Sequence, residues 1–205
     1  MHISEGVLSA PVLITGTALA VAGISLGLKR MDYDRIPQVA VLSSAFFVAS
    51  LIHVPVGPSS VHLILNGING LLLGWVCFPS MLVALALQAI LFQFGGITVL
   101  GVNTVTMALP GVICYYLFGR LVNQESRFLS SASGFACGFL SVLLSGILVA
   151  ISLAFTGKSF LSVAKLIILA HVPVMIAEGV ITLFCVAFLK RVKPEMLGGV
   201  YGKAS

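Results

Sequence analysis

Long apolar stretches alternate along this chain with short segments rich in charge, proline or glycine. Several of these stretches reach the roughly 20 apolar residues that a helix needs to cross a bilayer. The pattern therefore predicts an all-α polytopic membrane protein, with about seven transmembrane helices in one bundle. The predicted helices cover residues 7–29, 36–54, 62–78, 80–98, 103–121, 130–156 and 160–189.

Three of the connections carry clear helix-breaking residues. The loop at 55–60 reads PVGPSS, and Phe94-Gly95-Gly96 contains two adjacent glycines. Around Cys77-Phe78-Pro79 we expect a tight turn, in which the proline opens the next helix. All the connections are short, and no linker divides the chain, so we expect a single domain over residues 1–205.

The composition supports the membrane assignment. Of the 205 residues, 59% are hydrophobic and only 8% are charged, and the mean hydropathy is +1.16. Ordinary soluble domains carry about 25% charged residues, so this chain could not cover a water-facing surface. The net charge is +5, but no basic run is longer than two residues, so the charge does not indicate nucleic-acid binding.

The positive residues instead indicate orientation, because cytoplasmic loops of membrane proteins are enriched in Lys and Arg. With the amino terminus outside and the carboxyl terminus inside, only Lys158 and Lys165 fall on the outer side. We therefore expect a multi-pass protein of the cytoplasmic membrane, with Met1, His2 and the 55–61 loop on its outer face. The nine cytoplasmic residues are Lys29, Arg30, Arg35, Arg120, Arg127, Lys190, Arg191, Lys193 and Lys203.

Small residues in the first predicted helix form a surface that another helix could approach closely. Gly16, Ala20, Gly23 and Gly27 are spaced four, three and four apart. Either a neighbouring helix of the same chain or a separate membrane subunit could pack there. The four cysteines show no CxxC spacing, and we interpret them as small buried residues rather than as metal ligands. They are Cys77, Cys114, Cys137 and Cys185.

Candidate chemistry begins at the first two residues. The chain opens MHISEGVLSAP, without the basic region that starts a signal peptide. Methionine aminopeptidase normally removes Met1 only when the second residue is small. Because His2 is not small, we expect Met1 to be retained with a free amine. The amine and the His2 amide would close a five-membered ring on a metal ion, and that amide and the His2 Nδ1 a six-membered ring. Such a nearly planar set suits Ni(II) or Cu(II) and can be adopted by Co(II).

One further nitrogen would complete a square around the ion. His62 follows the breaker loop and opens the third predicted helix, whereas His53 lies at the outer end of the second. The residues alone leave both candidates open. Because the amine and the amide must lose protons, binding should weaken in acid. A set of nitrogen donors disfavours Mg²⁺ and Ca²⁺, which prefer oxygen, but does not separate nickel from cobalt.

A carboxylate in an apolar span is costly, so Glu178 in the last predicted helix needs an explanation. It lies on one helix face with His171 and Met175, at i, i+4 and i+7. One hypothesis is that it is protonated or satisfied by polar side chains of other helices. The other is that it stabilises the amino-terminal region or lines an exit route. The candidate partners are Asn66, Asn69, Gln88 and Asn103.

Three polar residues near the candidate ligands could support them. Glu5 could orient the His2 ring or cap the first helix with its charge. Asn66 and Asn69 follow His62 in the third predicted helix, where they could hydrogen-bond a ligand imidazole. Helix packing explains the two asparagines equally well. We regard His171 as a packing histidine rather than a ligand.

The opening MHISEGVLS and the loop PVGPSSVH resemble the CbiM/NikM family, and so do Glu178-Gly179 and the KPEML tail at 193–197. Members are the substrate-capture subunits of energy-coupling-factor transporters for cobalt and nickel. The resemblance covers nearly the whole chain. It implies metal ligation by the Met1 amine, by the amide and imidazole of His2, and by His62. The loop departs from many relatives, which read SSSHPTGTG where this chain reads SSVHLILNG, so His53 remains an alternative to His62.

The resemblance also implies partners and excludes enzymatic activity. It implies a coupling transmembrane subunit, ATP-binding-cassette ATPases and, as a further candidate, a small accessory membrane subunit. Cobalt or nickel would be the transported substrate, with no cofactor. The chain itself holds only the fragment Gly157-Lys158-Ser159, and Ser152 stands where a P-loop needs glycine, so energy must come from partners.

Two other functions compete with metal capture. A haem-binding or electron-transfer subunit could use His53 and His171 as axial ligands. A capture subunit for an organic vitamin would need an aromatic pocket. The single tryptophan, Trp75, and four tyrosines argue against the vitamin.

Overall fold

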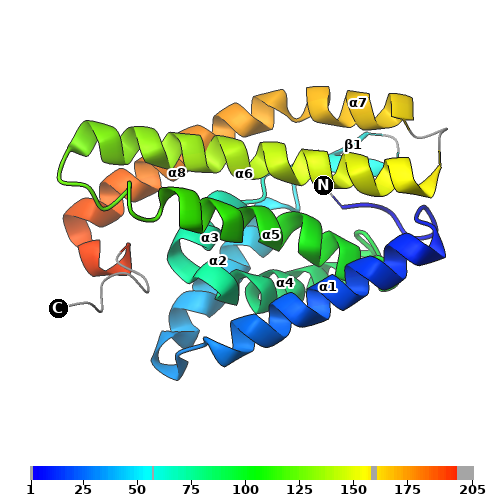
Figure 1. The fold of residues 1–205 in the computed structure, drawn as a ribbon, viewed down its shortest axis with the longest axis horizontal. Coiled ribbons are helices and arrows are strands. Elements are labelled where there is room, and N and C mark those ends of the chain that lie inside the picture. Colours follow the sequence, from blue (N-terminus) through cyan, green and yellow to red (C-terminus); the bar gives the residue numbers. More distant parts are fainter. Residues whose placement is uncertain (1, 57, 158–160, 198–205) are drawn as a thin grey trace.

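The computed structural model describes residues 2–56, 58–157 and 161–197, and in these ranges the chain is a bundle of helices that carries one small hairpin (Figure 1). Met1, Gly57, Lys158, Lys203 and the Lys165 side chain, on which sequence predictions fall, lie outside the description. The helices are α1 (Ala10–Lys29), α2 (Ile36–Ala49), α3 (Asn66–Leu73), α4 (Cys77–Phe92), α5 (Leu100–Phe118), α6 (Arg127–Thr156), α7 (Leu161–Ala170) and α8 (Val172–Val192); the strands are β1 (His53–Val56) and β2 (Ser59–His62).

The described helices confirm a mostly helical chain built to cross a membrane. Five described segments are long and apolar enough to do so. The other helices, α2 with 14 residues and α7 with 10, are shorter than a bilayer requires. The five segments are Ala10–Lys29, Asn66–Phe92, Leu100–Phe118, Arg127–Thr156 and Val172–Val192.

The segment Asn66–Phe92 is a helical hairpin rather than one straight helix. His62, just before α3, and Gln88, near the end of α4, both contact His2, so the start of α3 and the end of α4 lie at the same end of the molecule. The chain reverses at Gly74, whose combination of φ 55° and ψ −126° is readily adopted only by glycine. The predicted turn was therefore placed about three residues too late, and Pro79 lies in the first turn of α4.

The predicted helices 36–54 and 62–78 were wrong where they ran into residues 53–62. These residues form the antiparallel pair β1–β2, in which His53 lies opposite His62 and Val56 lies opposite Ser59. Pro55 has no amide hydrogen for a helix, and the neighbouring valines favour a strand. Ile3 forms a further antiparallel bridge with Ser59, so the amino-terminal segment lies along the hairpin as a third, very short strand.

The last predicted helix, 160–189, is also interrupted. It divides at His171 into α7 and α8, and Pro173 lies in the first turn of α8, where its missing amide hydrogen costs nothing. The predicted helix 80–98 ends early, at Phe92, because Gln93 adopts a left-handed conformation with φ of 58°.

Glycines allow the helices to pack backbone against backbone. Gly16 and Gly23 of α1 lie against Val102 and Phe78, so the small-residue face of α1 is covered by the chain's own helices. On α6, a Cβ at Gly138 would lie 2.4 Å from the Glu178 carbonyl oxygen of α8. The close approach of α8 to α6 at this point therefore requires glycine. The four cysteines are free thiols in apolar surroundings, as expected for packing residues.

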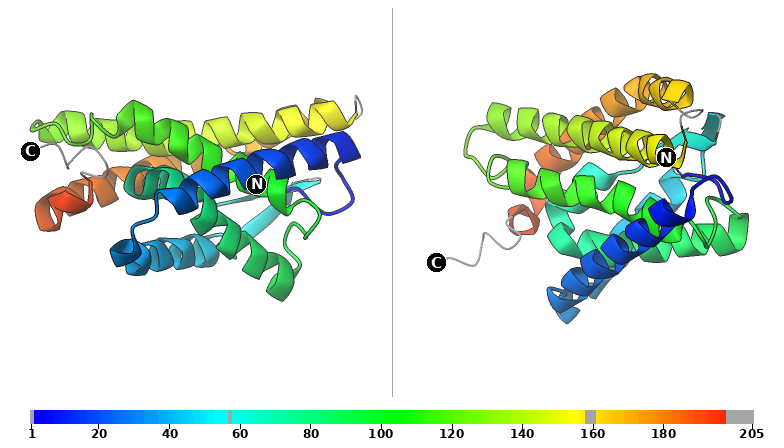
Figure 2. Two further views of the ribbon diagram at one scale, coloured as in Figure 1. Left: turned by 60° about the horizontal axis from the view of Figure 1, so that its bottom comes forward. Right: turned by 45° about the vertical axis from the view of Figure 1, so that its right-hand side comes forward.

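The polar segments collect at two opposite ends of the bundle. At one end Lys190 donates to the Gln124 carbonyl and the Asn123 side chain donates to the Leu197 carbonyl, which joins the α5–α6 connection to α8 and the segment after it. At the other end lie the amino-terminal segment, the β1–β2 hairpin and the connection between α4 and α5. The two further views in Figure 2 show the amino-terminal segment before α1 near the hairpin, in accord with the bridge between Ile3 and Ser59.

Candidate metal-binding site

Residues 2–5 are held in the bundle by main-chain hydrogen bonds to three separate elements. The Ile3 amide donates to Asn103 Oδ1 at 3.0 Å, and Asn103 Nδ2 donates back to the Ile3 carbonyl at 3.2 Å. The Ser4 amide donates to the Pro58 carbonyl, and the Glu5 amide donates to the Gly95 carbonyl. The Ile3 side chain is fully buried. The segment is therefore docked rather than extended into solvent, and it places His2 inside the bundle.

Gln88 of α4 fixes the orientation of the His2 ring. Its side-chain nitrogen donates to the Phe47 carbonyl at 3.1 Å and to Ser50 Oγ at 2.5 Å, which leaves its oxygen free to accept. That oxygen lies 2.8 Å from His2 Nε2, so Nε2 must carry the ring hydrogen. The lone pair of the His2 ring is then on Nδ1, the atom that the proposed six-membered chelate requires.

His62 has the opposite tautomer. Its Nδ1 lies 2.8 Å from the Leu63 carbonyl oxygen, which can only accept, so Nδ1 carries the hydrogen. The lone pair on Nε2 is buried and has no hydrogen-bond partner among the described residues. The centroids of the His2 and His62 rings are 4.6 Å apart, with the planes inclined by 30°. Each ring therefore offers one nitrogen lone pair within a small shared volume.

Burial keeps both imidazoles neutral. It lowers the pKa of His2 to about 3 and lowers the pKa of His62 well below its ordinary value. A metal ion binds the neutral ring, so neither imidazole has to lose a proton near neutral pH.

His53 lies at the margin of this pair. It is half-buried, and its Nδ1 lies 3.1 Å from the Leu51 carbonyl oxygen. Its ring meets the Phe94 ring edge-on, with the centroids 4.3 Å apart, and Phe94 lies 6.3 Å from the His2 ring. The structure thus brings His2 and His62 into direct contact and places His53 next to the aromatic ring beside them.

The predicted roles of Glu5 are not seen. Helix α1 begins at Ala10 with Ser9 as its N-cap residue, and no acidic residue lies in its first turn. The Glu5 carboxylate instead accepts a hydrogen bond from the Thr98 amide at 3.4 Å. It therefore links the amino-terminal segment to the connection before α5 and is not hydrogen-bonded to His2.

The described hydrogen bonds of the asparagines of α3 do not reach the histidines either. Asn66 Nδ2 donates to the Met107 carbonyl and to Ser145 Oγ, so it joins α3 to α5 and α6. The Asn69 side chain has no hydrogen-bond partner in the part of the chain that the structure describes. Glu178 accepts from the Ile64 and Leu65 amides, and not from the polar side chains that the sequence suggested.

The supporting residues that sequence reasoning missed are Gln88 and Asn103. Both are uncharged polar residues inside apolar helices, which is the available signal, since such groups must find a partner. Their partners, His2 and Ile3, lie 86 and 100 residues away along the chain, so no local pattern could identify them.

The described side chains do not form a complete metal site by themselves. Within residues 2–56, 58–157 and 161–197, no group of three His, Cys, Asp or Glu side chains could hold a metal ion. His2 and His62 supply two nitrogens.

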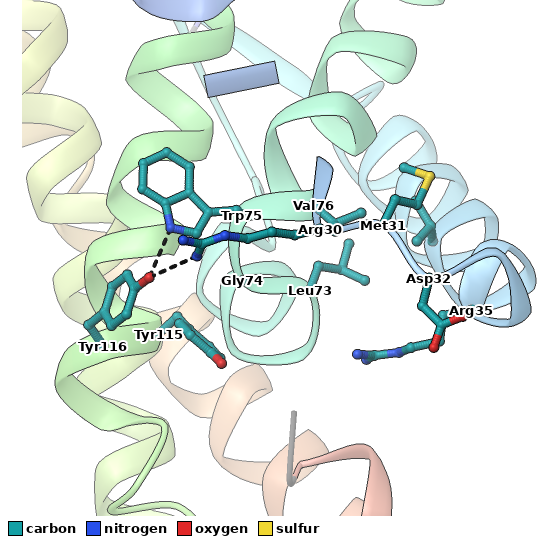
Figure 3. Close-up of a pocket in the computed structure, with 11 residues that line it drawn as sticks. Arg30, Met31, Asp32, Arg35, Leu73, Gly74, Trp75, Val76, Tyr115 and Tyr116 are labelled. Carbon is teal, nitrogen blue, oxygen red and sulfur yellow. Dashed lines mark hydrogen bonds between the residues drawn. The ribbon is translucent and has the colours of Figure 1, made fainter. Parts of the chain in front are cut away.

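An aromatic pocket exists, but at the opposite end of the bundle (Figure 3). The Tyr116 hydroxyl accepts hydrogen bonds from Trp75 Nε1 at 2.9 Å and from Arg30 Nη1 at 3.2 Å. Arg30 also lies over the Trp75 ring, 5.7 Å from its centroid. Trp75 and Tyr116 therefore lie far from His2, beside which the aromatic side chain is Phe94.

Comparisons with known proteins agree on one family. Residues 2–196 match the family described as "Cobalt uptake substrate-specific transmembrane region". A protein of Haemophilus influenzae that is named for metal transport is 47% identical over 199 residues, which are 96% of this chain and 97% of that protein. The "Cobalt transport protein CbiM" of Kyrpidia tusciae is 30% identical and covers 96% of this chain and 86% of its own. A crystal structure of a truncated transition metal transporter has a TM-score of 0.75 at 27% identity, covering 94% of this chain and 99% of that one.

Proposed function

This chain belongs to the family of cobalt-uptake substrate-specific transmembrane regions, and on that premise we propose that it captures Co²⁺ or Ni²⁺ for import across the membrane. The observation that carries the proposal is the contact between the buried, neutral His2 and His62 rings, each with one available lone pair. Both relatives described above are named for metal transport, and neither for electron transfer or haem binding.

We propose that the ion is bound by four nitrogens: the Met1 amine, the His2 amide, His2 Nδ1 and His62 Nε2. The ring contact of 4.6 Å and the two opposite tautomers support this set, because they direct Nδ1 of one ring and Nε2 of the other to the same ion. His53, beside Phe94, is outside the proposed set. Four nitrogens in a plane suit Ni(II) and reject the oxygen-seeking ions Mg²⁺ and Ca²⁺.

The orientation follows from the two ends of the bundle. We propose that the His2 end faces outward and that the charged connections face the cytoplasm, in accord with the excess of Lys and Arg there. We further propose seven passages between the two ends of the bundle, counting α3 and α4 separately and α7 with α8 as one, although the helical parts of α2 and α3 are by themselves shorter than a bilayer.

Transport against a gradient requires energy that this chain does not supply. We propose that it acts with a coupling transmembrane subunit and ATP-binding-cassette ATPases, in the manner of energy-coupling-factor transporters. Substrate capture is then separated from ATP hydrolysis, and the ion is released when the partners change the packing of the bundle.

Metal titration of the purified chain tests the ligand set. We expect a variant with one residue added before Met1 to bind Ni(II) at least about tenfold more weakly, because its amine can no longer close the five-membered ring. His2→Ala and His62→Ala should each weaken binding by a similar factor. His53→Ala is the matched control, and its affinity should remain close to that of the wild type. Equal Ni(II) binding by the extended chain would contradict the terminal chelate.

A further inference from the structure

The segment that connects β2 to α3 contains a peptide bond with two assigned partners. The carbonyl of the Leu63–Ile64 peptide accepts from His62 Nδ1 at 2.8 Å. The amide of the same peptide donates to Glu178 Oε1 at 2.5 Å. In a trans peptide the carbonyl and the amide point in opposite directions, so this one planar unit lies between the His62 ring and the Glu178 carboxylate.

Glu178 also binds the amide of the residue just before α3. Leu65, at the N-cap position of α3, has no capping side chain and adopts the left-handed conformation with φ of 54°, which is costly for a leucine. Its amide donates to Glu178 Oε1 at 2.7 Å. One carboxylate oxygen thus binds two consecutive amides at the positive end of α3, where a negative charge is favoured.

The rest of the packing holds Glu178 in place. The residue is fully buried. The absence of a Cβ at Gly138 lets the backbone of α8 approach α6 at the Glu178 carbonyl, and Gly67 of α3 packs against Gly138 on the same helix. Three helices therefore fix the carboxylate, and the carboxylate fixes the connection that carries His62.

We propose that Glu178 is the positioning residue of the metal site: it sets the plane of the Leu63–Ile64 peptide, and through that peptide it holds His62 in the orientation and tautomer that present Nε2 to the ion. This inference rests on the proposed function, because it assigns a role toward the bound ion. It also gives the intramembrane carboxylate a function without making it a ligand.

The proposal predicts that replacing Glu178 changes metal binding in the same way as replacing His62, with no additional effect on the other ligands. Cu(II) is a suitable probe, since its visible absorption moves to longer wavelength when a nitrogen ligand is replaced by water. We expect Glu178→Leu to shift the Cu(II) band to the position found for His62→Ala and to weaken binding about tenfold or more. Glu178→Gln keeps an oxygen that accepts from both amides, and it should retain the wild-type band.

A double-mutant comparison separates this role from general stabilisation. Because Glu178 acts through His62, Glu178→Leu in the His62→Ala background should cause no further loss of Cu(II) affinity. Thr182→Val is the control on the same face of α8, one turn further along. Its hydroxyl is buried and has no hydrogen-bond partner among the described residues, and we expect the wild-type band.

The outcomes distinguish this inference from the proposed function. A wild-type band for Glu178→Leu, or additive losses in the double variant, would overturn the positioning role while leaving the ligand set intact. If wild type and His62→Ala have the same band, the ligand set is wrong and the inference falls with it. Should Glu178→Leu fail to fold, Glu178→Asp provides the test. Its carboxylate is about 1.5 Å short of the amides, so the His62→Ala band is again expected and the wild-type band would refute the role.

Discussion

Gln88 is the only described hydrogen-bond partner of the His2 ring, so replacing it tests how much of the metal affinity depends on ring orientation. We expect Gln88→Met to fill the same space without accepting from Nε2. The ring is buried, so Nε2–H would be left without a partner or the hydrogen would move to Nδ1, the proposed donor atom.

The magnitude follows from the lost contact. A buried donor without a partner costs about 1–3 kcal/mol, and each 1.4 kcal/mol is about a factor of ten in affinity. We therefore expect Gln88→Met to weaken Ni(II) binding by roughly 10- to 100-fold, the range typical of residues that orient metal ligands. The bound-state spectrum should change little, since the same nitrogens bind.

Competition against a chelator of known affinity, with the protein in detergent, measures this effect. Ser50→Ala provides a graded variant, because it removes one of the two acceptors that orient Gln88 and should cause a smaller loss. Gln38→Met is the control, since Gln38 lies at the opposite end and accepts from Arg35. A Gln88→Met protein that binds Ni(II) within about twofold of wild type would refute the claim that ring orientation matters.

Three further predictions concern the docking of the amino terminus and of α8. Asn103→Leu should leave the buried Ile3 amide and carbonyl without their partners and speed hydrogen exchange at residues 2–5, while exchange in α6 stays unchanged. Gly138→Ala should lower the thermal midpoint by several degrees, because its Cβ meets backbone at 2.4 Å, whereas Gly134→Ala, which meets the Val186 side chain at 3.2 Å, should lower it less. Burial lowers the pKa of His2 from 6.5 to about 3, so between these pH values the unfolded chain binds a proton that the native chain excludes. The free energy of unfolding should therefore fall with falling pH by up to about 1.4 kcal/mol per pH unit. His2→Gln should flatten this decline between about pH 6.5 and 5.

The sequence was sufficient for the features that depend on long or specific local patterns. The apolar stretches predicted α1, α5 and α6 to within a few residues of their bounds. The pairing of His2 with a histidine beside the PVGPSS loop was also predictable, since both lie next to the same predicted outer face. The structure brings those two rings together, and the ligand set built on them remains a proposal.

The remaining features depend on contacts that periodicity does not encode. Residues 53–54 and 62 were predicted as the ends of two apolar helices and 55–60 as a loop, whereas the structure pairs 53–56 with 59–62 in a hairpin. Glu178 satisfies its carboxylate with main-chain amides of Ile64 and Leu65, and an amide carries no sequence signature. The left-handed conformation of Leu65 has no local sequence signal either, because leucine rarely adopts it.

Extended backbone, rather than helices, covers the His2 end of the bundle: the β1–β2 hairpin and the bridge from Ile3 to Ser59. Next to it, the backbone of α3 packs directly against the backbones of α6 and α5, at Gly67 against Gly138 and at Gly70 against Gly111. A short hairpin re-forms within about 1–10 μs, whereas parting close-packed helices means losing contacts along their length. If the chain captures metal as proposed, loading would disturb only a few strand hydrogen bonds, whereas release would require the helices to part, with energy from the proposed partner subunits.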